Sequence, residues 1–299
     1  MSAPRRSARR LVLRTSAKVN LVLEVLGTRQ DGYHELATVL QGIDLFDRLI
    51  LEKAEEITLR TRAEGLPTDE RNLVVRAARL LQEASGVRSG ARITLDKHIP
   101  VAAGLGGGSS DAAATLWGLN RLWRLRWPVQ RLREVASRLG SDIPFFFLGG
   151  RALATGRGEI LQPLPATPGL ALTLVNPRFP LSTREVYECV PSELKADGSQ
   201  AKALIAALAS GRAASVARSL YNSLESVVEA AHPMIGRIKA ALLAAGALGA
   251  VMSGSGPTVL GVARSLDHAS QIRRRVTTTA WSCWAVRTVP GPAIRLVQG

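Results

Sequence analysis

The chain has 299 residues, 46% of them hydrophobic, which is enough for one large domain or two of ordinary size with packed cores. It carries 39 lysines and arginines against 24 acidic residues, a formal net charge of +15, yet only 4% of its residues are aromatic. Because nucleic-acid binders combine basic grooves with aromatic stacking platforms, this composition argues against nucleic-acid binding and favours attraction of small polyanions. The sequence contains no run of 18 or more apolar residues, so we predict no membrane-spanning segment.

Residues 1–10 contain four arginines and no acid. They lack the apolar segment of a secretory signal, so we predict a basic disordered tail. Cys189 and Cys283 lie far apart and in no metal spacing, which is typical of free thiols in a reducing compartment and predicts a cytoplasmic protein. The four histidines form no His-x-x-x-His pair, and we expect no zinc held by the protein.

The first predicted element is a strand, or two strands, over residues 11–25. Lys18 and Asn20 are two residues apart, so a strand places both on the same face among apolar neighbours. An edge strand with a solvated face is the alternative interpretation. Asp31-Gly32 predicts a turn, after which Tyr33 and His34 are either a displayed aromatic pair or the start of the next strand.

The middle of the N-terminal half alternates strands with one helix. We predict strands over 35–45, a strand pair over 47–61, a helix from Thr68 to Ser85, and a strand over 91–95.

A glycine loop follows that strand. Four glycines lie within residues 104–108, Ser109 and Ser110 come next, and a helix is predicted over 111–123. Glycines let an anion approach backbone N–H groups, and a helix start adds free donors and a positive dipole end, so the segment predicts a phosphate cradle. It lacks the Gly-Lys-Ser/Thr of a Walker loop, and Ser109 occupies the third glycine position of a dinucleotide fingerprint. A flexible turn is the structural alternative.

An acidic residue next to an apolar run marks the following segment. After a predicted helix over 128–139, Asp142 precedes three consecutive phenylalanines. Capping of a short helix and a catalytic role are both compatible with this position, because a helix start favours an ionised carboxylate.

Three prolines within 162–169 predict a domain boundary, which divides the chain into 11–164 and 165–299. Beyond it we predict strands over 170–176 and 281–288, and helices over 199–209, 212–231, 233–245 and 266–276. Between the last two helices, residues 252–258 form a second glycine-serine loop flanked by apolar strands.

Three stretches, 16–20, 99–111 and 252–258, together resemble the signature motifs of the GHMP small-molecule kinases. The Asp-Gly-Tyr-His sequence at 31–34 and the segment 140–150 narrow the resemblance to members that phosphorylate a cytidine diphosphate-linked polyol in non-mevalonate isoprenoid synthesis. The resemblance covers about residues 12–289. It implies an α+β fold of two lobes. The N-terminal lobe would be like the second domain of ribosomal protein S5 with a left-handed crossover, which is rare, and the C-terminal lobe would be ferredoxin-like.

The resemblance also implies ATP-dependent phosphorylation of a hydroxyl group in the cleft between the lobes. Asp142 would accept or orient the hydroxyl proton, and Lys18, paired with an anionic Asp142, would stabilise charge on the transferred group. Asn20 would hold the polyol. Mg²⁺ would enter with ATP. The resemblance names no firm protein ligand for it, and Ser110 is the one candidate. The ATP-binding residues would be Pro100, Val101, Ala102, Ala103, Gly104, Leu105, Gly106, Gly107, Gly108, Ser109 and Ser110.

Substrate recognition is implied in the same way. Tyr33 and His34 would read the cytosine, Tyr187 would stack on it, and the residues Gly254, Ser255 and Gly256 would close the site near the substrate phosphates. Lys97 and His98 either touch ATP or only end a strand. The family loop often has more glycine at the positions of Ala102 and Ala103, and we expect alanine to remove the freedom to adopt a positive φ there. The expected partner is a small molecule, with no nucleic acid or membrane, and the chain is expected to be a monomer or weak homodimer.

Two other functions remain as alternatives. A mevalonate or homoserine kinase of the same family would have no need for the nucleobase reader at residues 31–34. A basic, non-catalytic RNA-binding module would fit the charge, but it would have no use for Lys18, Asp142 and the glycine loop.

Overall fold

The computed structural model describes residues 10–191 and 195–299. Of the tail predicted over 1–10, residues 1–9 lie outside the described residues, and the prediction is wrong for Arg10, which begins the first strand. The larger sheet has eight strands in the order β12-β1-β2-β4-β3, with β5 and β6 continuing from β2 and β8 beside β1. Its strands are β1 (Arg10–Thr28), β2 (His34–Ala54), β3 (Ile57–Thr61), β4 (Gly90–Asp96), β5 (Arg151–Gly156), β6 (Ile160–Pro163), β8 (Tyr221–Asn222) and β12 (Ile294–Gln298).

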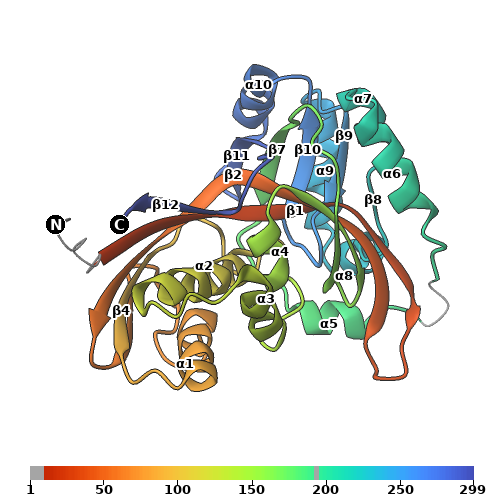
Figure 1. The fold of residues 1–299 in the computed structure, drawn as a ribbon. Helices are drawn as coiled ribbons and strands as arrows, with labels where there is room; N and C mark the ends of the chain where they lie inside the picture. Colours follow the sequence, from red (N-terminus) through yellow and green to blue (C-terminus); the bar gives the residue numbers. More distant parts are fainter. Residues whose placement is uncertain (1–9, 192–194) are drawn as a thin grey trace.

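The first two strands form one long hairpin, which Figure 1 shows as ribbons running from the end near β4 to the closed end near α5. The separate strands predicted over 35–45 and from 47 onward are wrong, because β2 has 21 residues and pairs with β1 along its length. Register shifts in β1, at Ser16/Ala17 and Asn20/Val22, absorb the strand twist without ending the ladder. Lys18 lies between these two irregularities.

Four helices of the N-terminal half are α1 (Leu73–Ser85), α2 (Gly107–Leu122), α3 (Val129–Ser137) and α4 (Ile143–Leu148). Alanine and leucine side chains of α1 and α2 pack with β2 and β4 in one buried cluster. The predicted helix start at Thr68 is wrong, since Asn72 caps α1 by accepting a hydrogen bond from the backbone N–H of Val74. The predicted end at Gly86 is confirmed by its left-handed conformation.

The second sheet has the antiparallel order β11-β7-β10-β9, built from β7 (Ala171–Asn176), β9 (Gly249–Met252), β10 (Val259–Ala263) and β11 (Ser282–Arg287). Counted within this half, the order is 4-1-3-2 with a β-α-β-β-α-β element sequence, which confirms the ferredoxin-like lobe. Its helices are α5 (Thr183–Glu188), α6 (Ser199–Ala209), α7 (Ala213–Arg218), α8 (Glu225–Ala231), α9 (Met234–Ala244) and α10 (Leu266–Val276). The single helix predicted over 212–231 is wrong, because β8 divides α7 from α8.

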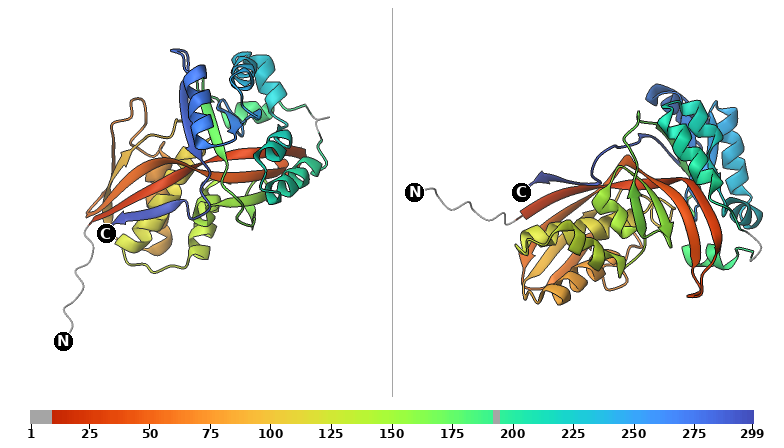
Figure 2. Two further views of the ribbon diagram at one scale, coloured as in Figure 1. Left: turned by 90° about the horizontal axis from the view of Figure 1, so that it is seen from above. Right: turned by 45° about the vertical axis from the view of Figure 1, so that its right-hand side comes forward.

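Two segments join the lobes: 164–169 leads from β6 to β7, and 288–293 leads from β11 back to β12, which pairs with β1. The start of β1 and the end of β12 therefore lie side by side at one end of the larger sheet, where Val12 pairs with Gln298 (Figure 2). The sequence does not predict β12, and the division at residue 164 remains a prediction. Every helix within the described ranges falls short of the length and apolar character that crossing a bilayer requires.

Candidate active site

The glycine loop and the start of α2 lie against the bulged part of β1. The backbone N–H of Lys18 donates to the carbonyl of Leu105 at 3.0 Å. Helix α2 begins at Gly107, four residues before the predicted start, so the last two glycines supply helix N-terminal N–H groups. The exposed loop residues are Val101, Ala102 and Gly108, the half-buried ones are Pro100, Gly104, Gly106 and Ser109, and the buried ones are Ala103, Leu105, Gly107 and Ser110.

Two glycines of the loop allow contacts that a side chain would prevent. A Cβ on Gly104 (φ +73°) would lie 2.1 Å from the carbonyl oxygen of Ser253, and one on Gly106 (φ +66°) would lie 2.9 Å from Cγ of Lys18. Ala102 also has a positive φ, 50°. The expectation that alanine removes this freedom is therefore wrong at Ala102, which adopts the left-handed conformation that glycine would adopt more easily.

Lys18 and Asp142 form an ion pair at the mouth of this loop. Lys18 Nζ lies 3.2 Å from Asp142 Oδ2, and the two side chains are 6% and 39% exposed. The ammonium also donates to Asn20 Oδ1 at 2.7 Å, and Asn20 Nδ2 donates to Thr38 Oγ1 at 2.8 Å. A buried cation is thus held between a carboxylate open to solvent and an oriented amide.

Asp142 directly precedes α4, with Pro144 in its first turn, as predicted. Its side chain makes no capping hydrogen bond to this helix. Asp142 Oδ1 lies 3.8 Å from the position of a Cβ on Gly158, in the turn between β5 and β6. The carboxylate is therefore directed to Lys18 and the space between the loops instead of capping the helix.

The second glycine-serine loop reaches the same place from the C-terminal lobe. Ser253 Oγ accepts from the backbone N–H of Asn20 at 3.1 Å and donates to the carbonyl of Gly104 at 3.0 Å. A Cβ on Gly254 would lie 2.9 Å from Asn20 Oδ1. The Asn222 amide donates to the carbonyls of Met252 and Gly254, both at 2.8 Å. This loop closes over the Lys18 side of the site.

Sequence reasoning missed three supporting residues. Ser253 lies inside a recognised motif, and the glycines that follow it, Gly254 and Gly256, were a usable signal. Thr38 and Asn222 carry no local signal, since one is in an ordinary strand pattern and the other lies within a segment predicted to be helical. Ser255 and Gly256 are buried behind Gly254, and Ser255 Oγ lies 2.9 Å from Thr183 Oγ1 of α5.

The aromatic residues predicted to bind cytosine converge from distant segments. The rings of His34 and Tyr187 lie 5.3 Å apart with an interplanar angle of 38°. Burial, with a contribution from the Asp142 charge, raises the pKa of the Tyr187 phenol, so Tyr187 is neutral at physiological pH. Tyr33 is 57% exposed, with the Arg157 guanidinium 4.9 Å from its ring centroid. The structure thus brings the His34 and Tyr187 rings together, with Tyr187 close enough to feel the Asp142 charge. It places Tyr33 against Arg157, which the sequence did not single out.

Lys97 lies beneath the glycine loop. Its side chain is 5% exposed, contacts Asp47, and lies 2.9 Å from Oδ2 of the buried Asp111. Burial raises the pKa of Asp111 well above its usual value. A Cβ on Gly107 would lie 2.7 Å from Lys97 Nζ. Of the two interpretations of Lys97, the structure favours the structural one, in which it supports the loop. The side chain of His98 is 57% exposed.

Magnesium coordination by the protein was expected to be weak. Ser110 is fully buried, and its hydroxyl donates to the carbonyl of Ser16 at 2.7 Å and lies 2.6 Å from Thr15 Oγ1. In the described residues, no three His, Cys, Asp or Glu side chains gather as a metal site.

These features define a class of small-molecule kinase. The family model for the GHMP kinases N terminal domain matches residues 72–150, and that for the GHMP kinases C terminal matches residues 204–282. A homoserine kinase structure from Cytophaga hutchinsonii, 21% identical, covers 99% of this chain and 100% of its own with a TM-score of 0.78, which supports the fold alone.

Curated relatives give a narrower assignment. The 4-diphosphocytidyl-2-C-methyl-D-erythritol kinase of Pelotomaculum thermopropionicum is 48% identical over 91% of this chain and 96% of its own. The enzyme of the same name from Symbiobacterium thermophilum is 49% identical over 91% of this chain and 98% of its own. A crystal structure of 4-(cytidine 5'-diphospho)-2C-methyl-D-erythritol kinase matches with 37% identity and a TM-score of 0.81 over 94% of this chain and 100% of its own. The chain belongs to the 4-diphosphocytidyl-2-C-methyl-D-erythritol kinase family within the GHMP kinases.

Proposed function

We propose that this protein transfers the γ-phosphoryl group of ATP to the 2-hydroxyl of 4-diphosphocytidyl-2-C-methyl-D-erythritol, giving the 2-phosphate and ADP in non-mevalonate isoprenoid synthesis. The observation that carries the proposal is the contact between Lys18 and Asp142 at the mouth of the glycine loop. Phosphoryl transfer needs three things: positioning of the reactants, stabilisation of charge, and a group that takes up the hydroxyl proton. Lys18 supplies the charge stabilisation and Asp142 takes up the proton.

Each residue has a role that its position supports. Asp142 accepts the proton of the 2-hydroxyl as the oxygen attacks. Lys18 stabilises negative charge on the attacking oxygen and on the transferred group. Asn20 is held by Thr38 and orients both Lys18 and the polyol. The backbone N–H groups of residues 100–110 hold the ATP phosphates. Mg²⁺ would neutralise phosphate charge when bound with ATP, and Ser110 is a poor candidate ligand because its hydroxyl is already engaged.

Base recognition would come from the aromatic group near Asp142. His34 and Tyr33 would read the cytosine edge while the Tyr187 ring stacks on its face, an interaction worth about 1–3 kcal/mol per base. Gly254, Ser255 and Gly256 would close over the diphosphate. We further propose that the chain acts in the cytoplasm as a monomer or weak homodimer, which size-exclusion chromatography with light scattering would test.

A coupled ADP-release assay with Mg-ATP tests the proposal. It compares 4-diphosphocytidyl-2-C-methyl-D-erythritol, mevalonate and homoserine as acceptors, for the wild type and for Asp142→Asn and Lys18→Met. We expect turnover with the cytidine substrate alone and a loss of about 100-fold or more in kcat in each variant. Asp267→Asn, an exposed acid on α10, is the matched control and should keep full activity.

Other outcomes would reject specific parts of the proposal. Turnover with mevalonate or homoserine would reject the base-reading role of His34 and Tyr187. No turnover with any acceptor, in a folded protein that binds RNA, would favour the binding-module alternative.

A further inference from the structure

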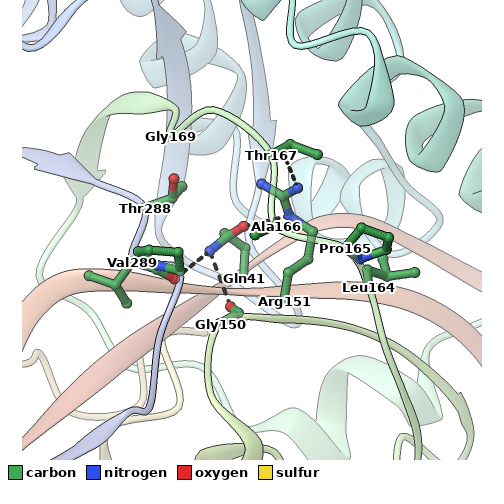
Figure 3. Close-up of a pocket in the computed structure, with 11 residues that line it drawn as sticks. Gln41, Gly150, Arg151, Leu164, Pro165, Ala166, Thr167, Gly169, Thr288 and Val289 are labelled. Atoms are coloured by element: carbon green, nitrogen blue, oxygen red, sulfur yellow. Dashed lines mark hydrogen bonds between the residues drawn. The ribbon is translucent and has the colours of Figure 1, made fainter.

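A cavity of about 70 Å³ lies at the junction of the lobes and has no role in the proposed reaction. Figure 3 shows that Gln41 of β2 and Arg151 of β5 face it from one side, and that residues of the two connecting segments, 164–169 and 288–293, complete it. The cavity is therefore bordered by both of the segments that link the ferredoxin-like lobe to the larger sheet.

Arg151 is the charged group of this cavity, and it is only 8% exposed. Its Nε donates to Gln41 Oε1 at 2.6 Å, and its Nη1 donates to Thr167 Oγ1 at 2.5 Å. A guanidinium has five N–H groups, so three remain without an acceptor in the described part of the chain. Burial lowers the pKa of Arg151, and no carboxylate opposes that shift. None of the eleven residues lining the cavity is acidic.

Two hydroxyl groups of the lining are also able to donate. Thr167 Oγ1 accepts from Arg151, and Thr288 Oγ1 accepts from the backbone N–H of Leu170 at 2.8 Å, so the hydrogen of each hydroxyl is available. Gln41 Nε2 is turned to backbone carbonyls, among them those of Gly150 at 3.1 Å and Val289 at 3.2 Å. The guanidinium therefore has neutral acceptors but no acidic residue in the lining to balance its charge, and a buried charge is unfavourable unless an opposite charge accompanies it.

We propose that this cavity binds one phosphate-sized oxyanion, held by Arg151 together with the hydroxyls of Thr167 and Thr288. The planar guanidinium offers paired N–H groups that match an oxyanion. A single water needs about 10–15 Å³ of such space, whereas nucleotide-sized ligands occupy pockets of about 300 Å³ or more, so the volume suits one phosphoryl group.

A bound oxyanion would connect both linking segments to β2 beside the catalytic strand. Gly42, next to Gln41, is directly opposite Lys18 in the β1–β2 ladder, and its N–H donates to the carbonyl of Gly150 at 2.8 Å. The bound anion would therefore stabilise the junction of the lobes next to the strand that carries Lys18. This anion site is separate from the glycine loop.

Isothermal titration of the full chain tests the proposal with two probes, inorganic phosphate and methyl phosphate, at constant ionic strength. Each titration is repeated with saturating ADP, which occupies the glycine loop. The variants are Arg151→Gln and Thr167→Val, and Arg88→Gln, an exposed arginine, is the control for loss of one charge. Thr167 lies in a connecting segment outside the helices and strands, so we expect Thr167→Val to fold. Its phosphate affinity can then be measured even if Arg151→Gln does not fold.

We expect saturable phosphate binding that persists with ADP. Because a hydrogen bond to a charged group is worth about 1.5–3 kcal/mol, Kd should rise about 10-fold or more in Arg151→Gln. It should rise by a smaller factor in Thr167→Val and stay unchanged in Arg88→Gln. Binding of methyl phosphate as well would identify a phosphate ester as the natural source, and binding of inorganic phosphate alone would identify the free ion. No binding by the wild type, binding abolished by ADP, or an unchanged Kd in both cavity variants would overturn the proposal.

Discussion

Replacement of Lys97 by methionine should destabilise the protein strongly and in a pH-dependent way. The Lys97 ammonium lies between Asp47 and Asp111, and none of the three side chains is more than 5% exposed. Methionine has a similar length and no charge, so Lys97→Met leaves two carboxylates facing each other in a buried space. Asp111 Oδ1 already lacks a hydrogen-bond partner within the described residues.

The magnitude follows from the protonation that the variant requires. At pH 7 at least one of the two carboxylates must take up a proton, because two like charges in contact disfavour ionisation. An ordinary aspartate has a pKa of about 3.9, and each unit between that value and the pH costs about 1.36 kcal/mol, or about 4 kcal/mol in all. This agrees with the loss of about 3–5 kcal/mol found when one partner of a buried ion pair is removed.

The pH dependence has a definite sign. Burial raises the pKa of Asp111, and without Lys97 no cation opposes that rise. Between about pH 5 and 7 the folded variant then holds a proton that the unfolded chain lacks, so its stability decreases as the pH rises, by about 1.4 kcal/mol per unit. Acidification from pH 7 to 5.5 should therefore recover about 2 kcal/mol of the loss relative to wild type.

Urea unfolding at pH 5.5, 6.25 and 7, followed by circular dichroism, measures this effect. The exposed Lys53→Met is the matched control and should change the free energy of unfolding by no more than about 0.5 kcal/mol. Adding Asp111→Asn to Lys97→Met should restore more than half of the lost stability at pH 7. A loss below about 1 kcal/mol at pH 7, or an equal loss at pH 5.5, would refute the reasoning.

Three further predictions concern the site. Tyr187→Ala should raise KM for the cytidine substrate about 5- to 100-fold through lost stacking, whereas Tyr187→Phe should keep KM within about 3-fold; equal values for the two would exclude stacking. Gly104→Ala should abolish ATP binding, measured by titration, because its Cβ would lie 2.1 Å from the Ser253 carbonyl oxygen; normal affinity would show that the loop can move. Ala102→Gly should leave the free energy of unfolding unchanged or raise it by about 1 kcal/mol, since the backbone of Ala102 has a φ of +50°, which glycine adopts without strain. A lower free energy of unfolding would contradict the inference that Ala102 is strained.

Part of the site was visible in short segments of sequence. The two-residue spacing of Lys18 and Asn20 predicts one strand face, and the glycine run with its serines predicts an anion cradle at a helix start. Asp142 before three phenylalanines was unusual enough to be noticed. These are patterns of local period and conformation, and the resemblance of three of them to the GHMP signatures supplied the reaction that local patterns cannot specify.

Helix and strand boundaries were less predictable where tertiary contacts outweighed propensity. Helix α2 begins inside the glycine run, although glycine is a poor helix former, because Gly106 and Gly107 leave room for Lys18 and Lys97. The apolar, alanine-rich segment over 212–231 reads as one helix. It is interrupted at β8, where Tyr221 pairs with β1 and the Asn222 amide binds two carbonyls of the second loop.

The sequence by itself therefore determined which chemical groups are present and which secondary structure holds most of them, because both depend on neighbours within a few residues. The tertiary structure alone decided that Lys18 lies 3.2 Å from Asp142 and that the His34 and Tyr187 rings meet beside that pair. It also decided that Arg151 is enclosed without an acid at the junction of the lobes. These contacts join residues far apart in the chain, and they depend on the packing of the two sheets and their connecting segments, which no local pattern records.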